Sequence, residues 1–139
     1  MRDPVLGRLE LDRKLGSFDG KVTLWGKRRR FSVEVGRDHD HDAAITDAKR
    51  SFAWIERSRG KIEKALVAKL FKAYDQGEWS EGRPRITKEK FLARIKVESV
   101  AAYGGGFAQL YLGAGTLFHG HGIDVKIRGL ALSEINLAG

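Results

Sequence analysis

The chain has 139 residues, a length typical of one compact domain, and we expect a single domain over residues 1–139. No apolar run approaches the roughly 20 residues that cross a bilayer, which excludes a helical membrane span, and the first residues lack an apolar signal core. Cysteine is absent, which excludes disulfides and thiolate metal sites, and we expect a cytoplasmic protein.

The net charge of +8 would attract phosphate backbones and other anionic partners, and salt would weaken that attraction. The basic residues are spread along the chain, which favours a role in solubility over one binding block. The basic residues between Arg83 and Lys96, and those at Arg57, Lys61 and Lys64, are interpreted as solvated faces.

The N-terminal quarter reads as three strands. Residues 5–11 alternate as in a half-buried strand, and residues 17–25 form a second strand with a bulge or kink at Asp19 and Gly20. A turn at Gly26 and Lys27 leads into residues 28–35, where Phe31, Val33 and Val35 share one face. The turns are too short for a crossover helix, so the pattern predicts an antiparallel meander.

A long helix follows, because apolar residues recur at helical spacing from Ile45 to Phe71. Acidic residues before it suit a helix N-terminus, and the helical pattern ends near Tyr74. Gly60 costs about 1 kcal/mol in a helix interior, so we expect a kink or short break there. The sequence leaves open whether this is one helix or two consecutive ones.

The C-terminal half begins with a short helix that Thr87 caps and that carries Phe91 inward. Four further strands are predicted at residues 98–103, 107–112, 122–127 and 133–137. Strands, helices and strands in this order indicate an α+β domain, an antiparallel sheet with helices packed on one face. Whether the sheet is open or closed into a barrel is not determined.

Two His-x-His pairs contain all four histidines. If His119 and His121 lie on a strand they point to the same side, and with Asp124 they supply two or three ligands for a divalent metal such as zinc. The competing interpretation makes one imidazole a turn hydrogen bonder and leaves the other on the surface. His39 and His41 are interpreted as part of a solvated, acid-rich helix start, where the two rings point apart.

A basic hairpin offers a possible nucleic-acid surface. Trp25 could stack on a base while Arg28, Arg29 and Arg30 contact phosphates. The alternative is an exposed hairpin whose charges protect it from edge-to-edge pairing.

Residues 118–125, Phe-His-Gly-His-Gly-Ile-Asp-Val, carry a family resemblance. They resemble the F-W-G-H-x-I-x-V signature of the DUF2262 proteins, a bacterial family of unknown function, and the likeness extends in order over nearly the whole chain. Phe118, Gly120 and His121 match the signature, whereas His119 stands where the family usually has tryptophan. The resemblance implies an α+β fold and contributes no activity.

No nucleophile stands beside an assignable base, so the first hypothesis is a cytoplasmic binding or accessory domain without catalytic activity, acting through a protein partner. The second is a metal-binding protein or metal-dependent hydrolase that uses His119 and His121. The third is weak nucleic-acid binding through a basic surface. No cofactor other than a possible divalent metal is expected.

Overall fold

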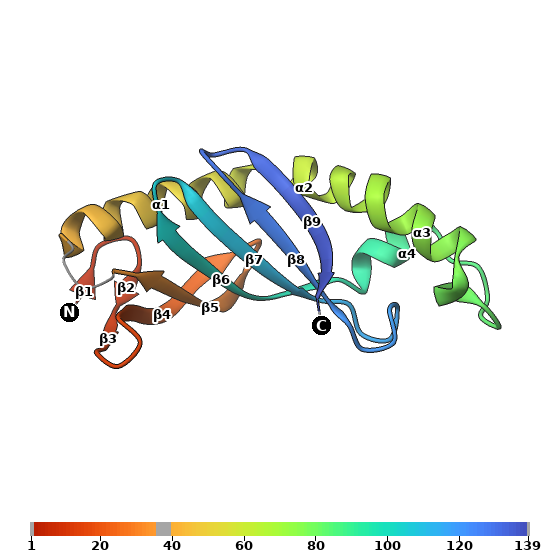
Figure 1. Cartoon of the computed structure of the whole chain (residues 1–139), viewed down its shortest axis with the longest axis horizontal. Helices are drawn as coiled ribbons and strands as arrows, with labels where there is room; N and C mark the ends of the chain where they lie inside the picture. Colours follow the sequence, from red (N-terminus) through yellow and green to blue (C-terminus); the bar gives the residue numbers. More distant parts are fainter. Residues whose placement is uncertain (1, 36–39, 139) are drawn as a thin grey trace.

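The computed structural model describes residues 2–35 and 40–138, and its elements run from strands through helices back to strands (Figure 1). The N-terminal strands are β1 (Arg2–Asp3), β2 (Gly7–Arg8), β3 (Glu10–Asp12), β4 (Ser17–Leu24) and β5 (Lys27–Glu34). The helical part comprises α1 (His41–Arg57), α2 (Arg59–Leu66), a π-helical turn (Val67–Phe71), α3 (Lys72–Gln76), a 3-10 turn (Glu78–Ser80) and α4 (Lys88–Ala93). The C-terminal strands are β6 (Lys96–Gly104), β7 (Phe107–Gly113), β8 (Gly122–Ile127) and β9 (Leu132–Ala138).

Seven strands form one sheet in the order β3-β4-β5-β6-β7-β8-β9, and β1 pairs with β2 in a small separate sheet. The order follows the chain and, within the described residues, β3 and β9 are its two edges, so the sheet is open. Both meanders are antiparallel as predicted, whereas β5 and β6 pair in parallel. The parallel pair arises because the whole helical layer connects the end of β5 to the start of β6. The predicted α+β class is confirmed.

The first predicted strand is interrupted. Asp3 Oδ1 accepts the backbone N–H groups of Val5 at 2.8 Å and Leu6 at 2.9 Å, which turns the chain before it can pair. Gly7 then has a φ of 73°, a conformation that disfavours other residues. Residues 5–11 therefore become the short strands β2 and β3 instead of one strand, because a local side-chain turn competes with the alternating pattern.

No bulge occurs at Gly20. Pairing of β4 with β5 continues through Asp19 and Gly20 without a register shift. A Cβ at Gly20 would lie 2.7 Å from the carbonyl oxygen of Arg8 and 2.7 Å from the ring of Phe31. The glycine is thus explained by the close approach of the β2 segment and the Phe31 ring, not by a kink.

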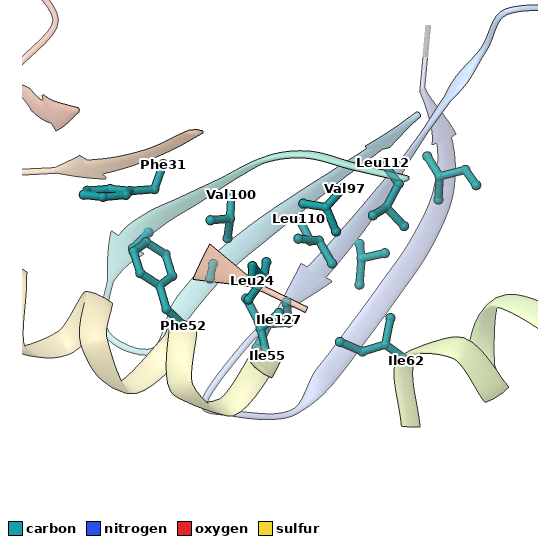
Figure 2. Close-up of a cluster of buried hydrophobic side chains, with 14 of the residues drawn as sticks. Leu24, Phe31, Phe52, Ile55, Ile62, Val97, Val100, Leu110, Leu112 and Ile127 are labelled. Atoms are coloured by element: carbon teal, nitrogen blue, oxygen red, sulfur yellow. The ribbon is translucent and has the colours of Figure 1, made fainter. Parts of the chain in front are cut away.

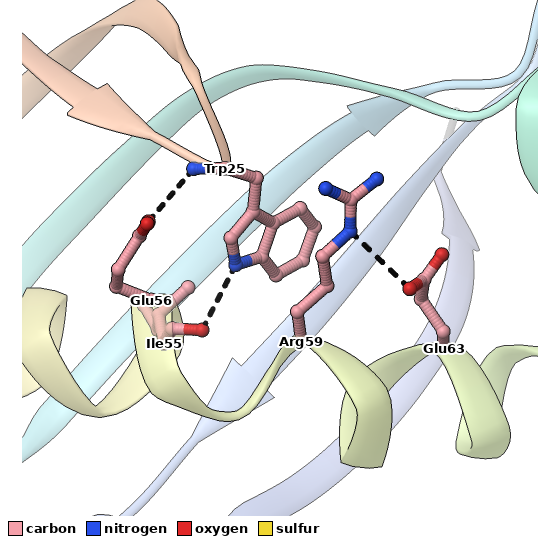
Figure 3. Close-up of polar contacts among 5 residues, drawn as sticks. All are labelled: Trp25, Ile55, Glu56, Arg59 and Glu63. Carbon is pink, nitrogen blue, oxygen red and sulfur yellow. Dashed lines mark hydrogen bonds and ion pairs between the residues drawn. The ribbon is translucent and has the colours of Figure 1, made fainter.

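The long helix begins and breaks at identifiable hydrogen bonds. Asp40 is the N-cap, and its side chain accepts from the N–H groups of Asp42 and Ala43. α1 ends at Arg57, so the break falls at Ser58, two residues before the predicted Gly60. There the carbonyl of Ile55 accepts from Ser58 N at 3.2 Å and from the indole Nε1 of Trp25 at 3.1 Å, as Figure 3 shows for the indole.

The π-helical turn keeps one face of the helix on the core. The buried residues Ile62, Leu66, Leu70 and Tyr74 are spaced four apart. In a regular α-helix a spacing of four drifts by roughly 40° each time. The wider π turn accommodates an additional residue, so Leu70 and Tyr74 remain directed inward.

The core lies between the helices and one face of the sheet. Figure 2 shows Phe52, Ile55 and Ile62 of the helices directed toward strand side chains that include Val100 and Leu110. Inward residues alternate along the strands, and β7 shows this most plainly, with Ala108, Leu110 and Leu112 all buried. The helices pack on one face of the sheet, as predicted.

Candidate functional site

The two C-terminal histidines do not share a strand. His119 lies in the turn after β7 with a φ of 54° and is exposed, whereas His121 directly precedes β8 and is half-buried. Both rings stand edge-on to the indole of Trp79, with centroid distances of 5.2 Å for His119 and 5.9 Å for His121. Trp79 is 40 residues before His119 in the sequence, so its position beside the histidines depends on tertiary packing.

The predicted metal ligands do not gather into a site of three. Among residues 2–35 and 40–138, no group of three or more His, Cys, Asp or Glu side chains could hold a metal ion. Asp124 lies within β8, opposite Tyr111 on one side and Asn136 on the other. His121 Nδ1 is 3.1 Å from the carbonyl oxygen of Ala138, and in the tautomer that donates this bond Nε2 remains free. Metal binding by the pair stays a prediction.

The family-signature residues Phe118 and Gly120 have structural roles in the loop between β7 and β8. Phe118 is fully buried, and its ring meets Tyr74, Trp79 and Phe91 at centroid distances between 5.5 and 6.2 Å. Gly120 has a φ of 89°, which reverses the chain before β8. This arrangement makes Phe118 a core anchor that joins the helices to the loop between β7 and β8.

The N-terminal histidine pair is only partly visible. His41 is the first residue of α1, and its ring stands edge-on to Phe18 with the centroids 5.1 Å apart. His39 lies outside the described residues. The acid-rich helix start is confirmed by Asp40 and Asp42 at the beginning of α1.

Trp25 contacts the helical layer of its own chain. It occupies the β4–β5 turn with a φ of 51°, and Gly26 beside it has a φ of 83°, so the two-residue turn lies one position earlier than predicted. Its indole donates to Ile55, its backbone N–H donates to Glu56 at 2.7 Å, and Arg59 lies over the ring at 5.3 Å (Figure 3). The indole joins the hairpin to the helix break and has one face covered by a guanidinium.

The three hairpin arginines do not form one surface. Phe31 and Val33 face the core, so by alternation Arg29 points inward while Arg28 and Arg30 point to the opposite face. Arg29 is half-buried, and its Nε is buried without a hydrogen-bond partner in the described residues. Only Arg28 and Arg30 are therefore placed together on the face of the sheet that the helices leave uncovered.

This uncovered side of the sheet, which we call the open face, has an aromatic centre. Tyr103 on β6 and Tyr111 on β7 bring their hydroxyl oxygens within 3.0 Å, and the rings of Tyr103 and Phe107 have centroids 5.1 Å apart. The guanidinium of Arg128 lies over Phe107 at 5.0 Å. Tyr103 is 37% exposed.

Burial, together with the hydrogen bond from Tyr103 and the charge of Asp124, raises the pKa of Tyr111 well above the ordinary tyrosine range. The phenol of Tyr111 accordingly acts as a neutral hydrogen-bonding group at physiological pH. Sequence analysis assigned these residues to strands and missed them as a site. The alternation along β6 and β7 could have indicated them, because Tyr103 and Tyr111 fall at positions on the face opposite to the buried residues.

Charge is divided unequally between the two layers. Residues 41–95, which form the helices and their connections, contain 13 lysines and arginines and 8 acidic residues, a net +5 of the chain's +8. The open face is nearly neutral. Arg128 after β8 is one cation of this face, and ten further charged side chains alternate outward along β4 to β9, five basic and five acidic: Lys21, Arg28, Arg30, Lys96 and Lys126, with Asp19, Glu34, Glu98, Asp124 and Glu134.

Within residues 2–35 and 40–138, none of the helices combines the length and apolarity that a membrane span requires. The molecule is a small α+β domain with helices on one side of a seven-stranded sheet and a nearly neutral open face on the other.

The chain belongs to DUF2262, a family described as an uncharacterized protein conserved in bacteria, whose family model matches residues 3–131. The resemblance in residues 118–125 is thereby confirmed. No curated protein and no solved structure matches the chain.

Proposed function

We propose that this chain is a bacterial binding domain without catalytic activity of its own, and that its partner is a protein that docks on the open face of the sheet. The observation that carries the proposal is the aromatic centre of Tyr103, Phe107 and Tyr111 on the face opposite the helices. The proposed compartment is the cytoplasm, which the cysteine-free sequence supports.

The composition of the open face fits a protein surface. Protein interfaces place aromatic residues and arginine at the centre and polar or charged residues at the rim. Here Tyr103, Phe107 and Arg128 lie together, and mixed charges surround them on the neighbouring strands. A partner would gain the most binding free energy from contact with Tyr103, because the ring of this residue is rigid and exposed.

The charge balance argues against a nucleic acid as the partner on this face. A strand of nucleic acid requires a track of basic residues along its phosphates. The five outward basic side chains of β4 to β9 are interspersed with five carboxylates, among them Glu98, Asp124 and Glu134 on the C-terminal strands. A phosphate backbone crossing the sheet would meet these carboxylates.

The test is capture of a partner from a lysate of the source cells, followed by titration of the purified partner. Tyr103→Arg inserts a charge into the aromatic centre and should weaken the interaction by at least about tenfold, because it removes a central aromatic contact. The matched control is Lys61→Arg on the exposed side of α2, which should bind as the wild type does.

A partner that binds wild type, Tyr103→Arg and Lys61→Arg equally would contradict docking on the open face. Nucleic acid as the only captured material would contradict the protein partner. Melting curves of both variants must match the wild type, and the exposure of Tyr103 makes this the expected result.

A further inference from the structure

A hollow of about 410 Å³ lies at β4 and β5, lined by outward side chains of these two strands together with Arg8 and Glu10. None of its lining residues belongs to β6 or β7, which carry the aromatic centre. Gly20 lies at the hollow, and no aromatic side chain lines it. The charged side chains around it are four basic and two acidic, a formal charge of +2: Arg8, Lys21, Arg28, Arg30, Glu10 and Asp19.

Three of the basic residues crowd one another. Lys21 and Arg30 are direct cross-strand partners, and Arg28 precedes Arg30 by two residues on the same face of β5. Like charges directly opposite each other destabilise a sheet. All three side chains are exposed, and no ion pair joins them to a carboxylate within residues 2–35 and 40–138. The chain therefore leaves their mutual repulsion unrelieved.

The two carboxylates beside the hollow do not remove this surplus. Glu10 pairs with Arg8 at 3.6 Å, and within residues 2–35 and 40–138 neither carboxylate forms an ion pair with the three crowded cations. Asp19 accepts a hydrogen bond from Ser17 Oγ at 3.3 Å, and its negative charge is already included in the formal charge of +2. An anion with two or more negative charges would match the remaining charge, and two guanidinium groups beside an ammonium are well suited to the oxygens of phosphoryl groups.

We infer that this hollow is a binding site for a small molecule with two linked phosphoryl groups, held by Lys21, Arg28 and Arg30. Its volume falls within the range of small-molecule sites. A diphosphate concentrates charge at one place, as the three cations do, whereas a nucleic acid spreads single charges along a chain and would run onto the carboxylates of the neighbouring strands. The inference does not depend on the protein partner.

The experiment is titration calorimetry of the full chain with inorganic pyrophosphate at constant ionic strength, with sodium chloride as the balancing salt. Wild type should bind one equivalent saturably. Lys21→Gln combined with Arg30→Gln should bind at least about tenfold more weakly, because each change removes a charge-assisted contact. The matched control, Lys61→Gln combined with Lys64→Gln, lowers the net charge equally on α2 and should bind as the wild type does.

Two results would overturn the site: no saturable binding to wild type, or equal weakening in both double variants, which would reflect net charge alone. The Lys21 and Arg30 substitutions remove a like-charge pair from an exposed face, so a melting temperature at or above that of the wild type is expected and confirms that the variant is folded. Pyrophosphate binding that survives in Tyr103→Arg would show that the hollow acts independently of the proposed protein interface.

Discussion

Trp25 shows how one residue can serve a different role from the one that its neighbours indicate. In sequence it stands beside Arg28 to Arg30 and resembles part of a basic binding hairpin. In the structure its indole donates to the carbonyl of Ile55, an acceptor that the break at Ser58 leaves without its regular helical donor. The tryptophan thus joins two elements 30 residues apart and stabilises the end of α1.

Replacing Trp25 by phenylalanine should lower the free energy of unfolding by about 1 kcal/mol beyond the loss of ring area, because Ile55 loses a donor. Urea denaturation measures the change. Trp79→Phe is the matched control, since within the described residues the indole N–H of Trp79 makes no hydrogen bond while its ring also packs on other rings. Equal losses in the two variants would contradict a specific role for the indole N–H.

At the scale of secondary-structure elements, two glycines that each lie inside a regular element differ in the space around them. Gly60 lies in α2 with open space around the position of a Cβ, and Gly20 lies in β4 against the Arg8 carbonyl and the Phe31 ring. The helix breaks at Ser58 although Gly60 is the weaker helix former. Helix propensity indicated a break in this region, and the hydrogen bond from the hairpin determined its position.

Gly60→Ala should raise the free energy of unfolding by up to about 1 kcal/mol, because alanine restricts the unfolded chain and meets nothing in the helix. Gly20→Ala should lower it, because its Cβ would lie 2.7 Å from a backbone oxygen. Urea denaturation of the two variants measures both changes in the free energy of unfolding. A Gly20→Ala variant as stable as the wild type would contradict the close approach of β2 to β4.

At the scale of the whole molecule, the helical layer carries most of the net charge and the open face is nearly neutral. Residues 41–95 have a net charge of +5, and within the described residues only three basic side chains of that segment, Lys49, Arg59 and Arg85, form ion pairs. Lys61, Lys64 and Lys72 are exposed side chains of this layer. Such a surplus lowers the stability of the compact state through self-repulsion, and salt screens it.

The melting temperature should therefore rise when sodium chloride increases from about 20 mM to about 200 mM, since the Debye length then becomes shorter than most charge separations. The corresponding gain in the free energy of unfolding should stay below about 1 kcal/mol. Lys61→Gln combined with Lys64→Gln should reduce this salt-dependent rise, because it removes two of the repelling charges. A melting temperature that falls with salt would indicate that the ion pairs outweigh the repulsion.

The sequence by itself determined the α+β class, the order of strands and helices, the inward faces at Phe31, Val33 and Phe91, and the caps at the acidic helix start and Thr87. These features depend on periodicity and on side chains that bond their own backbone, which are local properties. The family was also recognisable from residues 118–125.

Only the tertiary structure decided the parallel pairing of β5 with β6, the break at Ser58, and the meeting of His119 and His121 at Trp79. The same holds for the open face, where Tyr103 and Tyr111 meet across two strands and Lys21 meets Arg30 across two others. Each of these contacts joins residues through strand register or helix packing. Register and packing depend on the whole core, so no short stretch of sequence specifies them.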